Sequence, residues 1–176
     1  MLLLINEKGL IRLKTNITLL LPSNIVSYQK KIGKVIADKL GMYFADVNDL
    51  LCFELSDLEH VLSVGGKEYL ENQENKIVKQ LGDYSNTLIS ISFDVFIRTK
   101  NLEILKNSSI VIYLKLEQPN YLKLLKKEKK DSLEEKVFLE KDKILQNVAD
   151  ITIHCKNTNK KDILNLILIK LNQFYD

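Results

Sequence analysis

The chain has 176 residues, of which 45% are hydrophobic and 28% are charged, and its net charge is +3. This length and composition predict one soluble globular domain over residues 1–176. The small net charge argues against binding to nucleic acid, and the apolar run Met1–Ile5 is too short to span a membrane. Two cysteines without a secretion signal are typical of a reducing compartment. We therefore expect a cytoplasmic protein.

The first two apolar stretches, Leu2–Ile5 and Leu10–Leu13, predict a β-hairpin within residues 1–14. The hairpin is an addition to the rest of the chain, and three roles are open for it. It could extend the central sheet by an edge strand, cover the binding cleft, or pair with a second subunit. We therefore expect a protein partner or self-association through this hairpin.

Five further apolar runs predict strands, and amphipathic patterns with helical spacing predict helices between them. The strands are expected at Ile17–Leu21, Met42–Ala45, Thr87–Ser92, Ser109–Leu116 and Ile151–Cys155. The helices are expected between residues 27 and 41 and at Leu50–Leu62, Lys67–Leu81, Val95–Lys106, Pro119–Lys127, Leu139–Val148 and Lys160–Phe174. Strands and helices that alternate in this way predict an α/β fold with a doubly wound parallel sheet.

Local signals mark the ends of several helices. Ser27 fits the N-cap of the first long helix, and Gly41 fits its end. Gly82 fits the end of the helix Lys67–Leu81. The segment from Lys126 to Lys143 alternates lysine and glutamate, which predicts a solvated face.

Four blocks of sequence, taken in order, resemble the shikimate kinase family, a nucleoside-monophosphate-kinase-like branch of the P-loop folds. The blocks are Ile32–Gly41 with Phe44–Asn48, Gly66–Glu74, Ile110–Leu114, and Leu139–Lys141 with Asn147–Ile153. The resemblance covers residues 16–171. It implies a three-layer α/β/α domain with a five-stranded parallel sheet, to which the hairpin is added. It also implies transfer of phosphate from ATP to a small-molecule hydroxyl.

The resemblance fails at the loop that binds phosphate. The family has Gly-x-x-Gly-x-Gly-Lys-Ser/Thr after its first strand, whereas this chain has SNIVSYQK at residues 23–30. A phosphate cradle uses successive backbone N–H groups in conformations that favour glycine. The alignment places Ser27, Gln29, Lys30 and Lys31 at nucleotide-binding positions, with Gln29 at the catalytic lysine and Lys30 at the hydroxyl that binds Mg²⁺. A slip of one residue makes Lys30 the lysine and Lys31 the hydroxyl position, and the Mg²⁺ ligand is lost either way.

Positions that hold the metal and the substrate in the family have also changed. Asp46 matches an aspartate near the metal, but a lone carboxylate at a strand end also fits a helix cap. Asn48 replaces an aspartate for the substrate hydroxyls, and an amide cannot accept a proton. The remaining changes are Glu71 for the arginine that binds the substrate carboxylate, Ser92-Phe93-Asp94 for a Gly-Gly-Gly loop, and Lys141 for a late-helix arginine. Residues 122–137 correspond to a shortened lid.

Two main functional hypotheses follow. In the first, the chain is a family member that has lost phosphate transfer, needs no cofactor, and binds a regulatory partner or another small ligand, because phosphoryl transfer depends on the altered groups. In the second, the chain is a divergent kinase that uses ATP and Mg²⁺, with Lys30 and Asp46 as catalytic residues and Asp46 as metal ligand. A binding module that shares only the architecture is a third alternative.

Overall fold

A five-stranded sheet forms the centre of the computed structural model, which describes residues 3–6, 9–12, 16–22, 25–56, 58–127 and 133–175. Its strands are β3 (Asn16–Leu20), β4 (Tyr43–Asp46), β5 (Thr87–Ser90), β6 (Ser109–Leu116) and β7 (Ile151–Cys155). They lie in the order β4-β5-β3-β6-β7, and each neighbouring pair is parallel. The predicted parallel sheet is confirmed, and β6 and β7 have the predicted bounds.

The predicted hairpin is present as β1 (Leu3–Asn6) and β2 (Gly9–Arg12), which pair antiparallel. The two strands form a separate sheet. Within the described residues, β1 and β2 pair only with each other, so the suggested edge strand on the central sheet is not formed.

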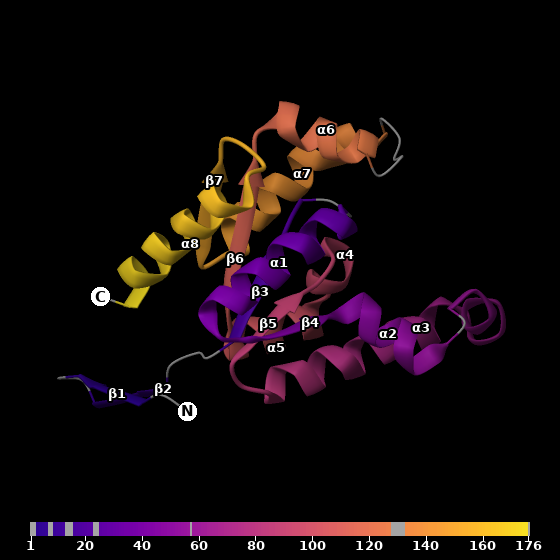
Figure 1. The fold of residues 1–176 in the computed structure, drawn as a ribbon. Helices are drawn as coiled ribbons and strands as arrows, with labels where there is room; N and C mark the ends of the chain where they lie inside the picture. The colour runs from indigo at the N-terminus through magenta and orange to yellow at the C-terminus, as the bar shows by residue number, and fades with distance from the viewer. Residues whose placement is uncertain are drawn as a thin grey trace.

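Helices cover both faces of the sheet and complete the three predicted layers (Figure 1). One face packs against α1 (Val26–Leu40), α6 (Gln118–Lys127) and α8 (Lys160–Tyr175). The other face packs against α2 (Val47–Leu55), α3 (Leu58–Asp83), α4 (Phe93–Phe96), α5 (Thr99–Ser108) and α7 (Leu133–Val148). Among the described residues, no helix combines the length and apolar character needed to cross a membrane.

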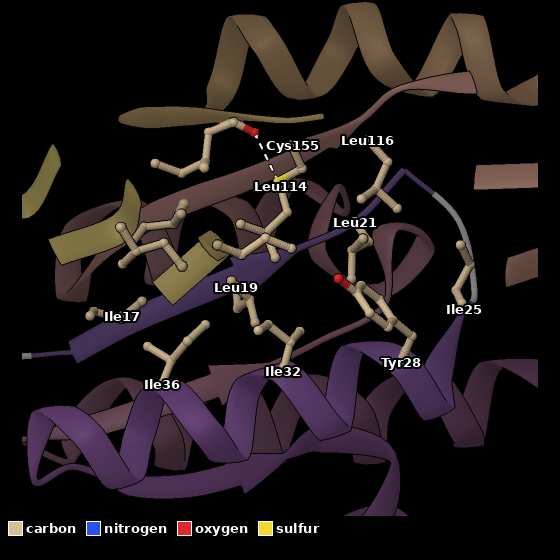
Figure 2. Close-up of a cluster of buried hydrophobic side chains, with 14 of the residues drawn as sticks. Ile17, Leu19, Leu21, Ile25, Tyr28, Ile32, Ile36, Leu114, Leu116 and Cys155 are labelled. Carbon is tan, nitrogen blue, oxygen red and sulfur yellow. Dashed lines mark hydrogen bonds between the residues drawn. The ribbon is translucent and has the colours of Figure 1, made fainter. Parts of the chain in front are cut away.

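The strands bury apolar side chains on both faces. Leu19 and Ile112 belong to the core on the α1 side, and Leu20 and Tyr113 belong to the core on the α3 side. Figure 2 shows the first of these cores, where Leu19 of β3 is directed toward Ile32 of α1. A strand that is buried on both faces reads as a continuous apolar run, which is why the strands were visible in the sequence.

The structure corrects the start of one predicted helix and divides another. α1 begins one residue before Ser27, so the prediction that Ser27 is the N-cap is wrong; Ile25 occupies that position without a side-chain hydrogen bond. Gly41 ends α1 as predicted, with a φ of 64°. The single helix expected at Val95–Lys106 is instead two helices, α4 and α5.

Gly82 lies inside α3, which continues to Asp83, so it does not end the helix as predicted. A Cβ atom at Gly82 would lie 2.6 Å from Cγ2 of Ile104 in α5. Gly82 therefore allows the close approach of α3 and α5. Such a contact between distant segments cannot be predicted from the local sequence. Gly66 lies between the helices expected at Leu50–Leu62 and Lys67–Leu81, and its φ of 72° and ψ of 178° are not helical although it lies inside α3.

The segment from Lys126 to Lys143 is not a uniformly solvated face, because α7 buries Phe138 and Asp142. Tyr113 Oη donates a hydrogen bond of 2.6 Å to Asp142 Oδ1, and Lys115 Nζ lies 3.2 Å from Asp142 Oδ2. Asp142 is therefore a charged residue of α7 that holds this helix against β6 through buried contacts. The predicted lid, residues 122–137, covers the end of α6, residues 128–132 outside the described part, and the start of α7.

Candidate functional site

The carboxyl ends of β3, β4 and β5 meet at one edge of the sheet, which is where ligands bind in parallel α/β folds. A cavity of about 240 Å³, here called the strand-end pocket, lies at this edge. Its lining residues are Val26, Gln29, Asp46, Val47, Asn48, Leu51, Glu74, Ser90, Ile91, Ser92 and Val95. Four of the sequence-predicted site residues line it, namely Gln29, Asp46, Asn48 and Ser92. The other predicted residues lie outside the lining: Ser27, Lys30, Lys31, Glu71 and Lys141.

Within the segment that aligns with the phosphate loop, the described residues 25–30 belong to the helix start and the core. α1 already includes Val26, and the backbone N–H of Gln29 donates to Ile25 O at 3.0 Å. Ile25 is fully buried, and Tyr28 is 8% exposed in the same core cluster (Figure 2). Tyr28 Oη also donates to Thr158 O at 3.4 Å. The N–H of Gln29 therefore donates within the protein, and the buried side chains of Ile25 and Tyr28 fill the core beside it. In a phosphate cradle, the backbone N–H groups point to the phosphate.

Gln29, which the alignment without gaps matches to the family's catalytic lysine, bridges two segments of the sheet. Its side chain is buried, and Nε2 donates hydrogen bonds of 2.9 Å to Leu19 O and of 2.9 Å to Ile91 O. Leu19 belongs to β3, and Ile91 follows β5. Because both partners are carbonyl oxygens, the group that faces them must be the NH₂ of the amide. Gln29 is thus a structural link between β3 and the end of β5.

Lys30 binds carboxylates instead of pointing into the pocket. Its Nζ donates a hydrogen bond to Asp49 and lies 3.4 Å from Asp46 Oδ1. Burial on its own would lower the pKa of Lys30, but the hydrogen bond to Asp49 and the nearby Asp46 raise it above its usual value. Asp46 is the N-cap of α2, where Oδ1 accepts from Asp49 N at 3.0 Å, and its Oδ2 accepts from Ser90 Oγ at 2.8 Å. The helix-cap alternative for Asp46 is therefore confirmed.

The residues around Asp46 do not fit a Mg²⁺ ion. Mg²⁺ requires near-octahedral oxygen ligands, whereas here the carboxylates of Asp46 and Asp49 share the single ammonium group of Lys30. The part of the chain that the structure describes contains no group of three or more His, Cys, Asp or Glu residues that could hold a metal ion.

On the substrate side, Glu71 pairs with cations and does not face the pocket. Its Oε1 lies 3.6 Å from Arg98 Nη2 and 3.6 Å from Lys67 Nζ. Arg98 also donates a hydrogen bond to Glu74, which lines the pocket. Arg98 is consequently held by two glutamates of α3.

Lys141 is likewise held by neighbouring side chains. Its Nζ lies 3.2 Å from Asp94 Oδ1 and 4.9 Å from the centre of the Phe93 ring. Lys141 thus contacts Asp94 and Phe93, the two residues that the alignment matches to the family's glycine loop. Asn48 and Ser92 line the pocket, and Ser92 is the N-cap of α4.

Sequence reasoning missed three residues of this site: Glu74, Ser90 and Arg98. Glu74 was part of a recognised block without an assigned role, and Ser90 is one of several serines near a strand end. Arg98 had a usable signal, because it is one of only two arginines in a lysine-rich chain. Arginine is preferred where a planar, bidentate partner for carboxylates is needed.

A sequence model of the family described as shikimate kinase matches residues 30–172. The match begins at Lys30, the last residue of the altered loop. Shikimate kinase from Sulfurihydrogenibium sp. (strain YO3AOP1) is 23% identical over 154 residues, which cover 84% of this chain and 93% of that protein. Shikimate kinase from Persephonella marina is 24% identical over 149 residues, with 81% and 91% covered.

Solved structures show the same fold. Shikimate kinase from Aquifex aeolicus has a TM-score of 0.73 at 19% identity and covers 89% of this chain and 96% of its own. The complex of Acinetobacter baumannii shikimate kinase with shikimate has a TM-score of 0.75 at 18% identity, with 90% and 93% covered. At these identities the likeness concerns the fold alone.

Proposed function

The chain belongs to the shikimate kinase family, and we propose that it is a member without phosphate transfer that has kept the strand-end pocket for another small ligand. The observation that carries this proposal is the buried bridge of Gln29 between Leu19 O and Ile91 O. The alignment matches Gln29 to the catalytic lysine, and the backbone N–H of Gln29 donates to Ile25 O at the start of α1.

The charges around the pocket support the same proposal. Phosphoryl transfer relies on cations placed against developing negative charge. Lys30, Arg98 and Lys141 are instead each paired with carboxylates of this chain. A phosphate or a substrate carboxylate would have to break one of these pairs to gain a partner.

Calorimetric titration with ATP in the presence of Mg²⁺ tests the proposal. We expect no saturable heat from this protein, whereas an active shikimate kinase measured in the same buffer serves as positive control. Binding of Mg·ATP with a dissociation constant in the micromolar range, about −8 kcal/mol, would overturn the proposal.

A second candidate function, a divergent kinase, is favoured by the pocket itself. The cavity lies at the strand ends, and the hydroxyls of Ser90 and Ser92 and the amide of Asn48 line it. A coupled assay for ADP release across small alcohols would test this, with Lys30→Ala beside Lys39→Ala, an exposed lysine of the same helix. Turnover that is lost only in Lys30→Ala would support the kinase, and no turnover in the unmodified protein would support the first function.

We also infer that the N-terminal hairpin mediates self-association. β1 and β2 form a two-stranded sheet by themselves, and an isolated hairpin is only marginally stable in water. Light scattering after gel filtration would compare the full chain with a variant carrying Leu4→Glu and Ile11→Glu, two residues that are paired in the register of the hairpin. We expect a mass above that of a monomer for the full chain and a monomer mass for the variant. Monomer masses for both proteins would contradict the inference.

A further inference from the structure

β4 forms one edge of the central sheet, and an open groove of about 610 Å³ lies against it. We call it the edge-strand groove. Its lining residues come from β4, α2, the end of α3 and the start of β5: Tyr43, Phe44, Ala45, Leu50, Leu81, Asp83, Tyr84, Ser85 and Thr87. The groove shares no residue with the lining of the strand-end pocket, so it is a separate site.

The wall of the groove combines an open strand edge with exposed aromatic rings. Within the described residues, β4 pairs only with β5. Tyr43 N–H donates to Asn86 O on the β5 side, so the backbone N–H and C=O of the next residue, Phe44, point to the open side. Tyr43 and Tyr84 are 76% and 61% exposed. An open strand edge accepts a further strand, and tyrosine is enriched where proteins bind each other.

The N-terminal hairpin joins the domain beside this groove. Asn16, the first residue of β3, donates from Nδ2 to Tyr84 O at 2.8 Å and accepts at Oδ1 from Thr87 N at 3.0 Å. Both partners line the groove. Only residues 13–15 separate Asn16 from the end of β2. The hairpin therefore leaves the sheet at the end where the groove lies, and Figure 1 shows it outside the three layers.

The strands of the hairpin are apolar and have no sheet to cover them. Five of the eight residues in β1 and β2 are leucine or isoleucine. Leu4 is paired with Ile11, and Ile5 is paired with Leu10. Successive pairs of a hairpin fall on its two faces in turn, so each face has an apolar pair. A two-stranded hairpin of this kind gains stability when it packs against another surface.

The hairpin and the groove also carry opposite charges. Asp83 is the only charged residue of the groove lining, and it has no ion pair within the part of the chain that the structure describes. Residues 3–15 contain three basic residues and one acid, which gives a net charge of +2; they are Lys8, Arg12, Lys14 and Glu7. A basic hairpin is thus complementary to the groove.

The length of the connection favours the hairpin of a second copy over that of the same chain. The strand order places β4 two strands away from β3, so a strand added beyond β4 would lie about 14 Å from β3. The four steps from Arg12 to Asn16 span at most about 14 Å. The hairpin of the same chain would therefore need a straight path across the residues that precede β5. A second copy has no such restriction.

We propose that the edge-strand groove binds the N-terminal hairpin of a second copy of this chain, and that the exchange is made in both directions. The proposal rests on the self-association proposed above and assigns the surface that receives the hairpin. The hairpin extends the sheet along the backbone of Phe44, its apolar residues cover Tyr43 and Tyr84, and its basic residues approach Asp83. Because the same two surfaces meet twice about a two-fold axis, the product is a closed dimer.

Light scattering after gel filtration tests the groove on the full chain with matched variants. Tyr43→Lys combined with Tyr84→Lys places two cations on the receiving surface and should give monomers. Tyr69→Lys changes an exposed tyrosine of α3 outside the lining and should leave the dimer mass unchanged. Asp83→Lys is a single change at an exposed position and should raise the dissociation constant of the dimer at least about tenfold. Far-ultraviolet circular dichroism checks that each variant is folded.

A folded double variant that keeps the dimer mass would overturn the groove as the receiving surface, although self-association would stand. Monomers of Tyr69→Lys would overturn it as well, because the effect would not be specific to the groove. If the double variant does not fold, Asp83→Lys decides, and an unchanged dissociation constant overturns the proposal. A dimer that survives Leu4→Glu with Ile11→Glu would exclude the hairpin as the occupant. A monomeric unmodified chain would overturn both the self-association and the groove.

Discussion

Replacing Gln29 by leucine would remove the two hydrogen bonds to Leu19 O and Ile91 O. Leucine has a similar size and a high helix propensity, so the lost hydrogen bonds dominate the effect. A buried acceptor that loses its donor costs about 1–3 kcal/mol. For two carbonyls, each of which has a second lone pair for other donors, we expect a loss of about 2–4 kcal/mol in the free energy of unfolding. In a chain of this length, that corresponds to a fall in Tm of about 4–16 °C.

Urea unfolding followed by far-ultraviolet circular dichroism measures this loss. The matched control is Gln80→Leu, at an exposed position of α3, for which we expect a change below about 0.5 kcal/mol. If Gln29→Leu and Gln80→Leu unfold within about 0.5 kcal/mol of each other, the reasoning that Gln29 holds β3 to the end of β5 is refuted.

Three further outcomes are expected. Gly33→Ala should destabilise the protein by about 1–3 kcal/mol, because the new Cβ would lie 2.6 Å from Phe44 Cε2. Helix propensity on its own favours alanine, so a variant that is stabilised in urea unfolding would contradict this reasoning. Burial raises the pKa of the Cys155 thiol from 9.0 to about 12, so the folded protein keeps a proton that the unfolded chain releases, and stability falls as the pH rises above about 9. Cys155→Val should reduce that fall by about 1 kcal/mol at pH 10, and equal pH profiles would argue against it. Cys52 is exposed, so one thiol should react with Ellman's reagent in the native protein, and two rapid reactions would be inconsistent with the structure.

The sequence was informative about where the site differs from the family's pattern but not about the contacts that the differing residues make. SNIVSYQK at residues 23–30 has no glycine, and this local fact predicts the absence of a phosphate cradle. The role of Gln29 could not be predicted in the same way, because its partners lie 10 and 62 residues away in the chain. The same holds for Arg98, whose glutamate partners belong to another helix.

By itself, the sequence determined the five central strands, most of the helices and the end of α1 at Gly41, because apolar spacing and a glycine at positive φ are local properties. The tertiary structure decided the strand order, the close packing at Gly82 and the use of Gln29 and Lys30 as internal partners. Each of these depends on which distant groups meet. A side chain that the alignment places in a ligand site can therefore be held by contacts within the protein instead.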